Sequence, residues 1–147
     1  MISRLLKYYS KIVLNDEVDS LKLSNVLLFA NIHNTGIGNL VWLYPLMKAL
    51  ESRGLTVVCE HEEMSRLLQY NLPRSIVCKF KDIPILPYGV SINNFLPQTT
   101  KNVRKVIELR IPVRIGHVWY GRMKYAWLFN IQVPINMGTR EGDSNAW

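Results

Sequence analysis

Short apolar runs and stretches with helical apolar spacing alternate along most of this chain. Residues 25–30 are almost continuously apolar, which is the pattern of a strand buried on both faces of a parallel sheet. Later runs of similar character predict an α/β fold, with a mainly parallel sheet of about five strands flanked by helices. These runs are residues 56–60, 75–80, 89–93 and 113–115, with a further short candidate within 128–133.

Helical apolar spacing separates the predicted strands. The first helix should end at Gly54, a typical C-cap residue. Pro45 conflicts with a helix that starts at Asn39, so we expect either a kink or a start nearer Trp42.

Two further helices are predicted, one over residues 61–70 and one capped by Thr99 or Thr100. Their inward-facing residues should be Met64, Leu67 and Leu68, and then Val103, Val106 and Ile107. Residues 81–88 are too few for a helical crossover, so the pattern leaves the topology open there.

A polar, glycine-bearing turn is predicted at residues 31–39, between the first strand and the first helix. Gly36 and Gly38 would let backbone amides approach a ligand, and the helix N-terminus behind them would favour an anion. Strand, glycine turn and helix form the opening of a Rossmann-like unit. The dinucleotide fingerprint is incomplete, because Val41 replaces its third glycine. A tight turn that binds no ligand is the alternative interpretation.

The charge balance favours anionic partners. Eighteen Lys and Arg residues against eleven Asp and Glu residues give a net charge of +7, which suits phosphorylated sugars, acidic lipids or nucleic acid. The basic residues are dispersed and no stacking motif of an RNA-binding sheet is visible, so we do not expect nucleic acid as a partner. Cys59 and Cys78 both lie in apolar, strand-like segments, which predicts reduced thiols, and no ligand spacing for a metal accompanies them.

The two ends of the chain suggest how it is organised. Residues 1–24 are predicted to be an amphipathic extension that packs on the domain or rests on an anionic membrane surface. Residues 25–147 should form one domain. The sequence has neither a run of about 20 apolar residues nor a signal peptide, so we expect a cytoplasmic protein, with peripheral membrane contact through the extension. A helix-capping pattern at Asp143 and Ser144 comes just before the last residue, so we expect a longer natural protein.

Two separated tracts resemble glycosyltransferase family 9, the heptosyltransferase group. Thr35-Gly-Ile-Gly-Asn-Leu-Val, followed by Tyr44-Pro-Leu-Met-Lys-Ala-Leu, is similar to the first loop and helix of these enzymes. Tyr88-Gly-Val-Ser-Ile-Asn, followed by Arg110-Ile-Pro-Val-Arg-Ile-Gly-His, is similar to their later strand–loop–helix–strand block. The resemblance covers residues from about 25 to the end and implies the amino-terminal, acceptor-side half of a two-domain GT-B fold.

The resemblance also implies an activity. It implies transfer of a hexosyl or heptosyl group, by inverting displacement and without a metal or other cofactor, to a glycolipid or saccharide acceptor. Such a step belongs to lipopolysaccharide biosynthesis. The nucleotide sugar would bind a carboxy-terminal domain that these 147 residues do not include. A catalytically silent Rossmann-like module that binds an anionic or sugar ligand is the alternative function.

The candidate catalytic residues are Asn39 and His33. Family 9 enzymes carry an aspartate, the proposed general base, at the position that matches Asn39, and an amide cannot accept that proton. Asn39 could instead orient the acceptor hydroxyl or cap the helix. His33 opens the glycine turn and is the preferred candidate base; the weaker candidates are Glu60, His61 and His117.

The candidate acceptor-binding residues are Thr35, Gly36, Gly38 and Lys101. Lys101 lies in the first turn of a predicted helix, with Arg104 and Lys105 close behind. A helix N-terminus and cations together would favour a phosphate on the acceptor. An ordinary solvated helix face is the alternative interpretation for Arg104 and Lys105.

Overall fold

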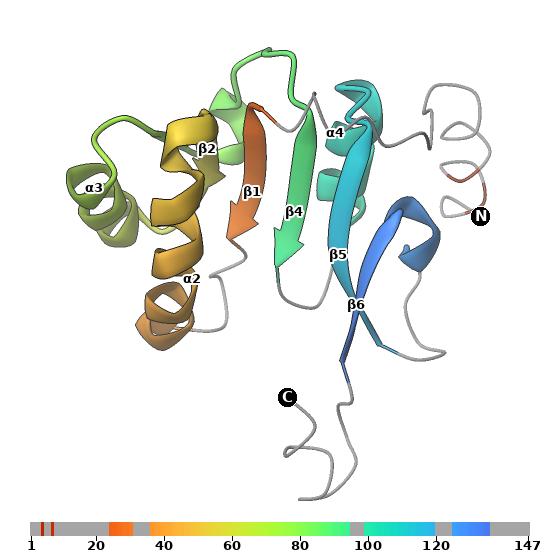
Figure 1. The fold of residues 1–147 in the computed structure, drawn as a ribbon, viewed down its shortest axis with the longest axis horizontal. Helices are drawn as coiled ribbons and strands as arrows, with labels where there is room; N and C mark the ends of the chain where they lie inside the picture. The colour runs from red at the N-terminus through yellow and green to blue at the C-terminus, as the bar shows by residue number, and fades with distance from the viewer. Residues whose placement is uncertain are drawn as a thin grey trace, which may run out of the picture.

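The protein contains one six-stranded parallel sheet with the order β3-β2-β1-β4-β5-β6 (Figure 1). The structure is a computed structural model that describes residues 24–30, 36–94, 99–119 and 125–135, together with Arg4 and Lys7, which are exposed and helical. The predictions for the remaining terminal residues lie outside this part of the chain. The strands are β1 (Val26–Ala30), β2 (Leu55–Val58), β3 (Ile76–Cys78), β4 (Val90–Asn94), β5 (Val113–Trp119) and β6 (Ile131–Ile135).

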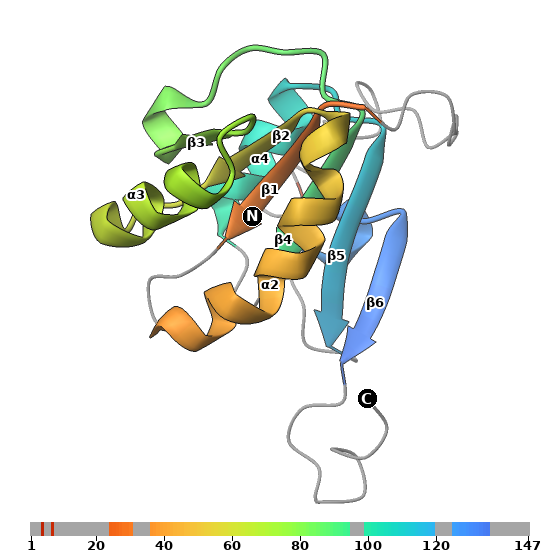
Figure 2. The same cartoon turned by 60° about the vertical axis from the view of Figure 1, so that its left-hand side comes forward.

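Helices cover both faces of the sheet, which gives a three-layer, Rossmann-like α/β fold. In Figure 2, α2 and α4 lie on opposite faces. One apolar cluster joins α2 and α3 to the sheet, and a second cluster joins the sheet to α4, η3 and η4. The α-helices are α2 (Gly36–Leu50), α3 (Glu62–Asn71) and α4 (Thr100–Glu108), and the 3-10 helices are η2 (Glu51–Arg53), η3 (Phe80–Asp82) and η4 (Ala126–Leu128).

Strand β1 is central and its side chains alternate between the two clusters. Val26, Leu28 and Ala30 pack toward α2 and α3, whereas Leu27 and Phe29 pack toward α4. Each of these residues is at most 3% exposed. Burial on both faces explains why this segment reads as a continuous apolar run, and each large side chain contributes roughly 1.5–3 kcal/mol.

The direction of strand addition reverses beside β1. Strands β2 and β3 add on one side of β1, and the chain then crosses to β4 on the other side. The crossover contains η3 and an extended stretch with Pro84 and Pro87, so it needs no long helix. Phe80, Ile83 and Leu86 of this segment pack on the α4 side of the sheet. Residues 81–88 are too few for a helical crossover, but as an extended segment they are long enough to connect β3 to β4.

The helix α2 differs from the prediction at its start. It begins at Gly36, so residues 36–39 are helical and do not belong to the predicted turn, whose residues 31–35 lie outside the described ranges. Of the two alternatives at Pro45, the start nearer Trp42 is wrong. Pro45 lies inside α2, and Figure 2 shows the first turns of this helix running in a different direction from the rest. Because proline removes one internal hydrogen bond and crowds the preceding turn, it bends the helix without ending it.

Three other expectations are corrected. The strand predicted over residues 113–115 is longer, because β5 continues through Gly116 to Trp119. An added Cβ at Gly116 would lie 2.6 Å from the ring of Phe129, so glycine is needed here for close packing within the strand. Leu67 is 48% exposed and does not face inward with Leu68. The sheet also has six strands instead of about five, because β6 forms at the edge, where Pro134 is tolerated.

Candidate functional site

The carboxyl edge of the sheet is the geometric candidate for a ligand site. Helix α2 follows β1 and helix α4 follows β4, so both helices begin at this edge, beside the point where the strand order reverses (Figure 1). The first N–H groups of each helix have no partner within the helix, and the helix dipole makes that end positive. Open parallel sheets bind their ligands at such reversal points.

The residues predicted around the first loop are only partly described. Gly36, Gly38 and Asn39 form the first turn of α2, so their backbone amides lie at the start of a helix at the carboxyl edge. His33, Thr35 and the side chain of Asn39 lie outside the described part of the structure. Their assignment to an acceptor site therefore stays a prediction.

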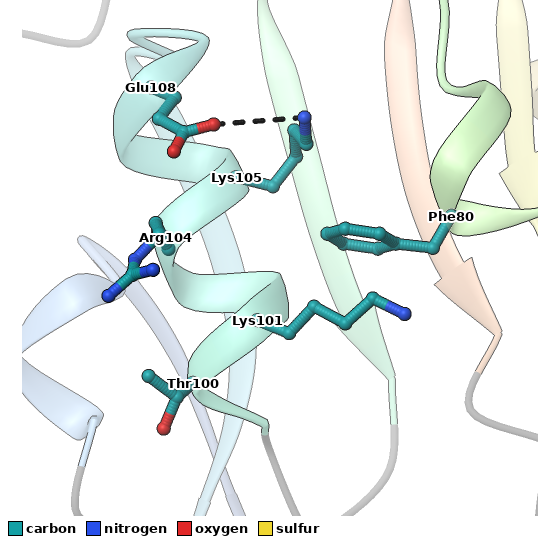
Figure 3. Close-up of a pocket in the computed structure, with 6 residues that line it drawn as sticks. All are labelled: Phe80, Thr100, Lys101, Arg104, Lys105 and Glu108. Atoms are coloured by element: carbon teal, nitrogen blue, oxygen red, sulfur yellow. Dashed lines mark ion pairs between the residues drawn. The ribbon is translucent and has the colours of Figure 1, made fainter.

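Lys101 lies in a pocket between α4 and the crossover. The pocket has a volume of about 420 Å³ and is lined by Phe80, Thr100, Lys101, Arg104, Lys105 and Glu108 (Figure 3). Thr99 starts α4 by accepting a hydrogen bond from the backbone N–H of Asn102 at 3.2 Å. The ammonium of Lys101 lies 4.0 Å from the centre of the Phe80 ring, and that of Lys105 lies 5.5 Å from it. Lys101, Arg104 and Lys105 thus share one basic pocket, which begins at a helix N-terminus.

Glu60 connects this pocket to the sheet. It lies two residues after Val58, the buried end of β2, and its Oε1 accepts a hydrogen bond from the N–H of Phe80 at 2.9 Å. The same oxygen lies 3.9 Å from the ammonium of Lys101. Glu60 therefore holds η3 and Lys101 in position. This role differs from that of a general base, whose carboxylate would be free to accept a proton.

Phe80 was missed at the sequence level. The apolar pattern predicts it as the last residue of a strand, whereas it begins η3, two residues after the end of β3, and places its ring against two lysines of α4. An aromatic residue close to a strand end is the local signal for this position. The lysines that it contacts lie more than twenty positions further along the chain, so the contact depends on the sheet order.

The two described histidines among the candidate bases do not line the pocket. His61 is the N-cap of α3, where its Nδ1 accepts a hydrogen bond from the N–H of Met64 at 3.4 Å. His117 is half-buried on β5, and burial lowers its pKa, which favours the neutral ring. Because side chains alternate along a strand, His117 shares the α2 face with Ile115, opposite the face that holds Phe80.

The two cysteines are free thiols whose side chains face opposite sides of the sheet. Cys59 packs in the cluster beneath α2 and α3, whereas Cys78 follows Val77, which packs toward that cluster, and so points the other way. Burial raises the pKa of Cys78 to about 11. Within the described ranges, no group of three or more His, Cys, Asp or Glu residues could hold a metal ion. In the same ranges, no helix is both long and apolar enough to cross a membrane.

Comparison with known proteins identifies no family for this chain, so the fold is the basis for its classification. No protein-family model matches the chain, and no curated protein matches it at a significant level. The parallel sheet and its strand order define a Rossmann-like α/β protein. The relation to glycosyltransferase family 9 therefore rests on the two sequence tracts alone.

Proposed function

We propose that this chain is the acceptor-binding half of a glycosyltransferase of the heptosyltransferase type. The observation that supports this best is the basic pocket along α4, whose first residues, Thr100 and Lys101, lie at the carboxyl edge of the sheet. Lysines and helix N-termini suit an anionic group, and the apolar face of Phe80 suits the edge of a sugar ring. A phosphorylated glycolipid or saccharide has both features.

The proposed reaction divides the work between two domains. A carboxy-terminal domain would hold the nucleotide sugar, and this chain would hold the acceptor at the carboxyl edge. The acceptor hydroxyl attacks the anomeric carbon, the bond to the nucleoside diphosphate breaks with its electron pair, and the hydroxyl proton passes to a base. We assign that base to His33 and the orientation of the hydroxyl to Asn39, with Thr35, Gly36 and Gly38 beside them.

The substitution Asn39→Asp in the full-length protein tests this function. A carboxylate at this position can accept the hydroxyl proton, so sugar transfer should rise by at least about tenfold, within the range of general-base catalysis. Transfer would be measured with a panel of nucleotide sugars and saccharide acceptors, with His33→Gln as the companion variant that should lose activity. Absence of transfer in both the natural protein and Asn39→Asp would contradict the enzyme proposal.

A silent binding module is the second candidate function. The amide of Asn39 favours it, as do the structural hydrogen bonds that engage Glu60 and His61. This candidate predicts saturable binding of an anionic saccharide with no transfer by either version of residue 39. Binding measurements alongside the transfer assay therefore separate the two functions.

A further inference from the structure

The first turn of α4 carries the charge that a helix N-terminus disfavours. Helix α3 carries Glu62 and Glu63 in its first turn, where negative charge is favourable. Helix α4 has no acidic residue in its first turn and instead carries Lys101 there, whereas Lys105 lies in its last turn, where a cation is favourable. Departures from local stability rules concentrate at functional sites, and α3 provides the contrast within the same chain.

The positive charges of this pocket are only partly neutralised by nearby carboxylates. Lys101 lies 3.9 Å from Glu60, and Lys105 lies 3.7 Å from Glu108. Both distances exceed the 2.7–2.9 Å or so of a strong charged hydrogen bond. Within the described residues, Arg104 forms no ion pair. The pocket lining therefore has a surplus of positive charge that a dianion could neutralise.

Two of the cations lie on the side of α4 that borders Phe80. Lys101 and Lys105 are one helical turn apart, and their ammonium groups lie 4.0 and 5.5 Å from the centre of the Phe80 ring. In Figure 3 the ammonium of Lys105 points toward Glu108, and Arg104 points away from the ring. Phe80 is held in place through its N–H by Glu60. Two ammonium groups on one helix face can reach different oxygens of one phosphate, and about 420 Å³ leaves room for an attached sugar.

We infer that the pocket between η3 and α4 binds a phosphate monoester, and that Glu60 is the counter-ion that the phosphate displaces from Lys101. Glu60 is the more buried member of that pair, with 28% of its side chain exposed against 58% for Lys101, so the lysine is the partner that moves. Glu60 keeps its hydrogen bond to Phe80 and thereby preserves the pocket wall. This inference deepens the proposed function, on which it rests, by naming a phosphorylated acceptor.

Titration of the 147-residue chain with inorganic phosphate tests the lysines. Lys101→Gln and Lys105→Gln should each weaken binding by roughly tenfold, because each removes one charged hydrogen bond. Arg66→Gln is the matched control, because Arg66 is an exposed cation paired with Glu62 on α3. Its affinity should stay within about twofold of the natural chain. Failure of phosphate to bind, or equal losses in Arg66→Gln, would overturn the inference.

Glu60→Gln tests the inference with a variant that should bind phosphate more tightly. The amide oxygen can still accept the hydrogen bond of Phe80, but the competing charge is gone, so phosphate affinity should rise by about two- to fivefold. Glu62→Gln, which removes an exposed acid on α3, should leave affinity unchanged. A purely structural role of Glu60 predicts weaker binding in Glu60→Gln, and that result in a folded variant would overturn the inference.

Two probes distinguish the sources of the phosphate. Glucose 1-phosphate represents a soluble sugar phosphate, and phosphatidylcholine vesicles with and without phosphatidic acid represent a lipid headgroup. Saturable binding of either probe that depends on Lys101 supports the site and identifies its source, whereas Lys101-independent binding of both overturns it. These binding measurements contain no sugar donor, so their outcome does not depend on the result of the transfer assay that tests the proposed function.

Discussion

Glu51 shows how a single buried carboxylate links three parts of the chain. It is 4% exposed at the end of α2, and it accepts hydrogen bonds from the ammonium of Lys48 at 3.0 Å and the N–H of Arg74 at 3.1 Å. The hydroxyl of Ser75 lies 3.4 Å from the same carboxylate. The hydrogen bond from Lys48 lowers the pKa of Glu51, and burial opposes that shift only in part.

Replacing Glu51 with Gln should destabilise the protein in a pH-dependent way. A lowered folded-state pKa means that the ionised carboxylate stabilises the fold above the unfolded value of 4.5, and that this contribution is lost as pH falls through the folded-state pKa. Thermal unfolding near neutral pH should occur roughly 2–6 °C lower in Glu51→Gln. The difference should shrink below about pH 4. A difference that stays constant down to about pH 3 would contradict this assignment.

At the scale of elements, the ends of helices could be predicted from the sequence because they depend on neighbouring residues. Gly54 ends the first helical region in a left-handed conformation with φ of 81°, as predicted, and α4 is capped by Thr99, one of the two predicted candidates. The errors arose where distant residues decide. The apolar pattern ends the fifth strand at residue 115, whereas β5 continues through Gly116, where the ring of Phe129 packs against the backbone. Gly36 and Gly38 favour a turn by sequence, whereas they form the first turn of α2.

The cap of α4 gives a prediction at this scale. Thr99→Ala should lower the free energy of unfolding by about 1 kcal/mol, because the N–H of Asn102 loses its acceptor. Thr99→Ser is the matched control and should retain most of the stability, since serine offers the same oxygen. Denaturant unfolding measures both variants. Equal loss in the two variants would show that the methyl group of Thr99, and not the hydrogen bond, is what matters.

At the scale of the whole molecule, the sequence predicted the fold class but only part of the composition of the pocket. Strand patterns and the start of the helix that carries the lysines are local features, so the parallel sheet and the basic pocket residues Lys101, Arg104 and Lys105 could be anticipated. The contacts among Glu60, Phe80 and Lys101 join the ends of two strands to a later helix. They follow only from the strand order and from the extended crossover, which apolar periodicity does not encode.

We propose that ligands bind at the carboxyl edge, between the starts of α2 and α4. Backbone amide NMR shifts during a titration with glucose 1-phosphate locate the bound ligand. We expect the largest changes at Gly36, Gly38, Phe80 and Lys101, and none at Gly54 and Gly89 on the opposite edge of the sheet. Changes centred on Gly54 and Gly89, or no saturable change at the carboxyl edge, would contradict it.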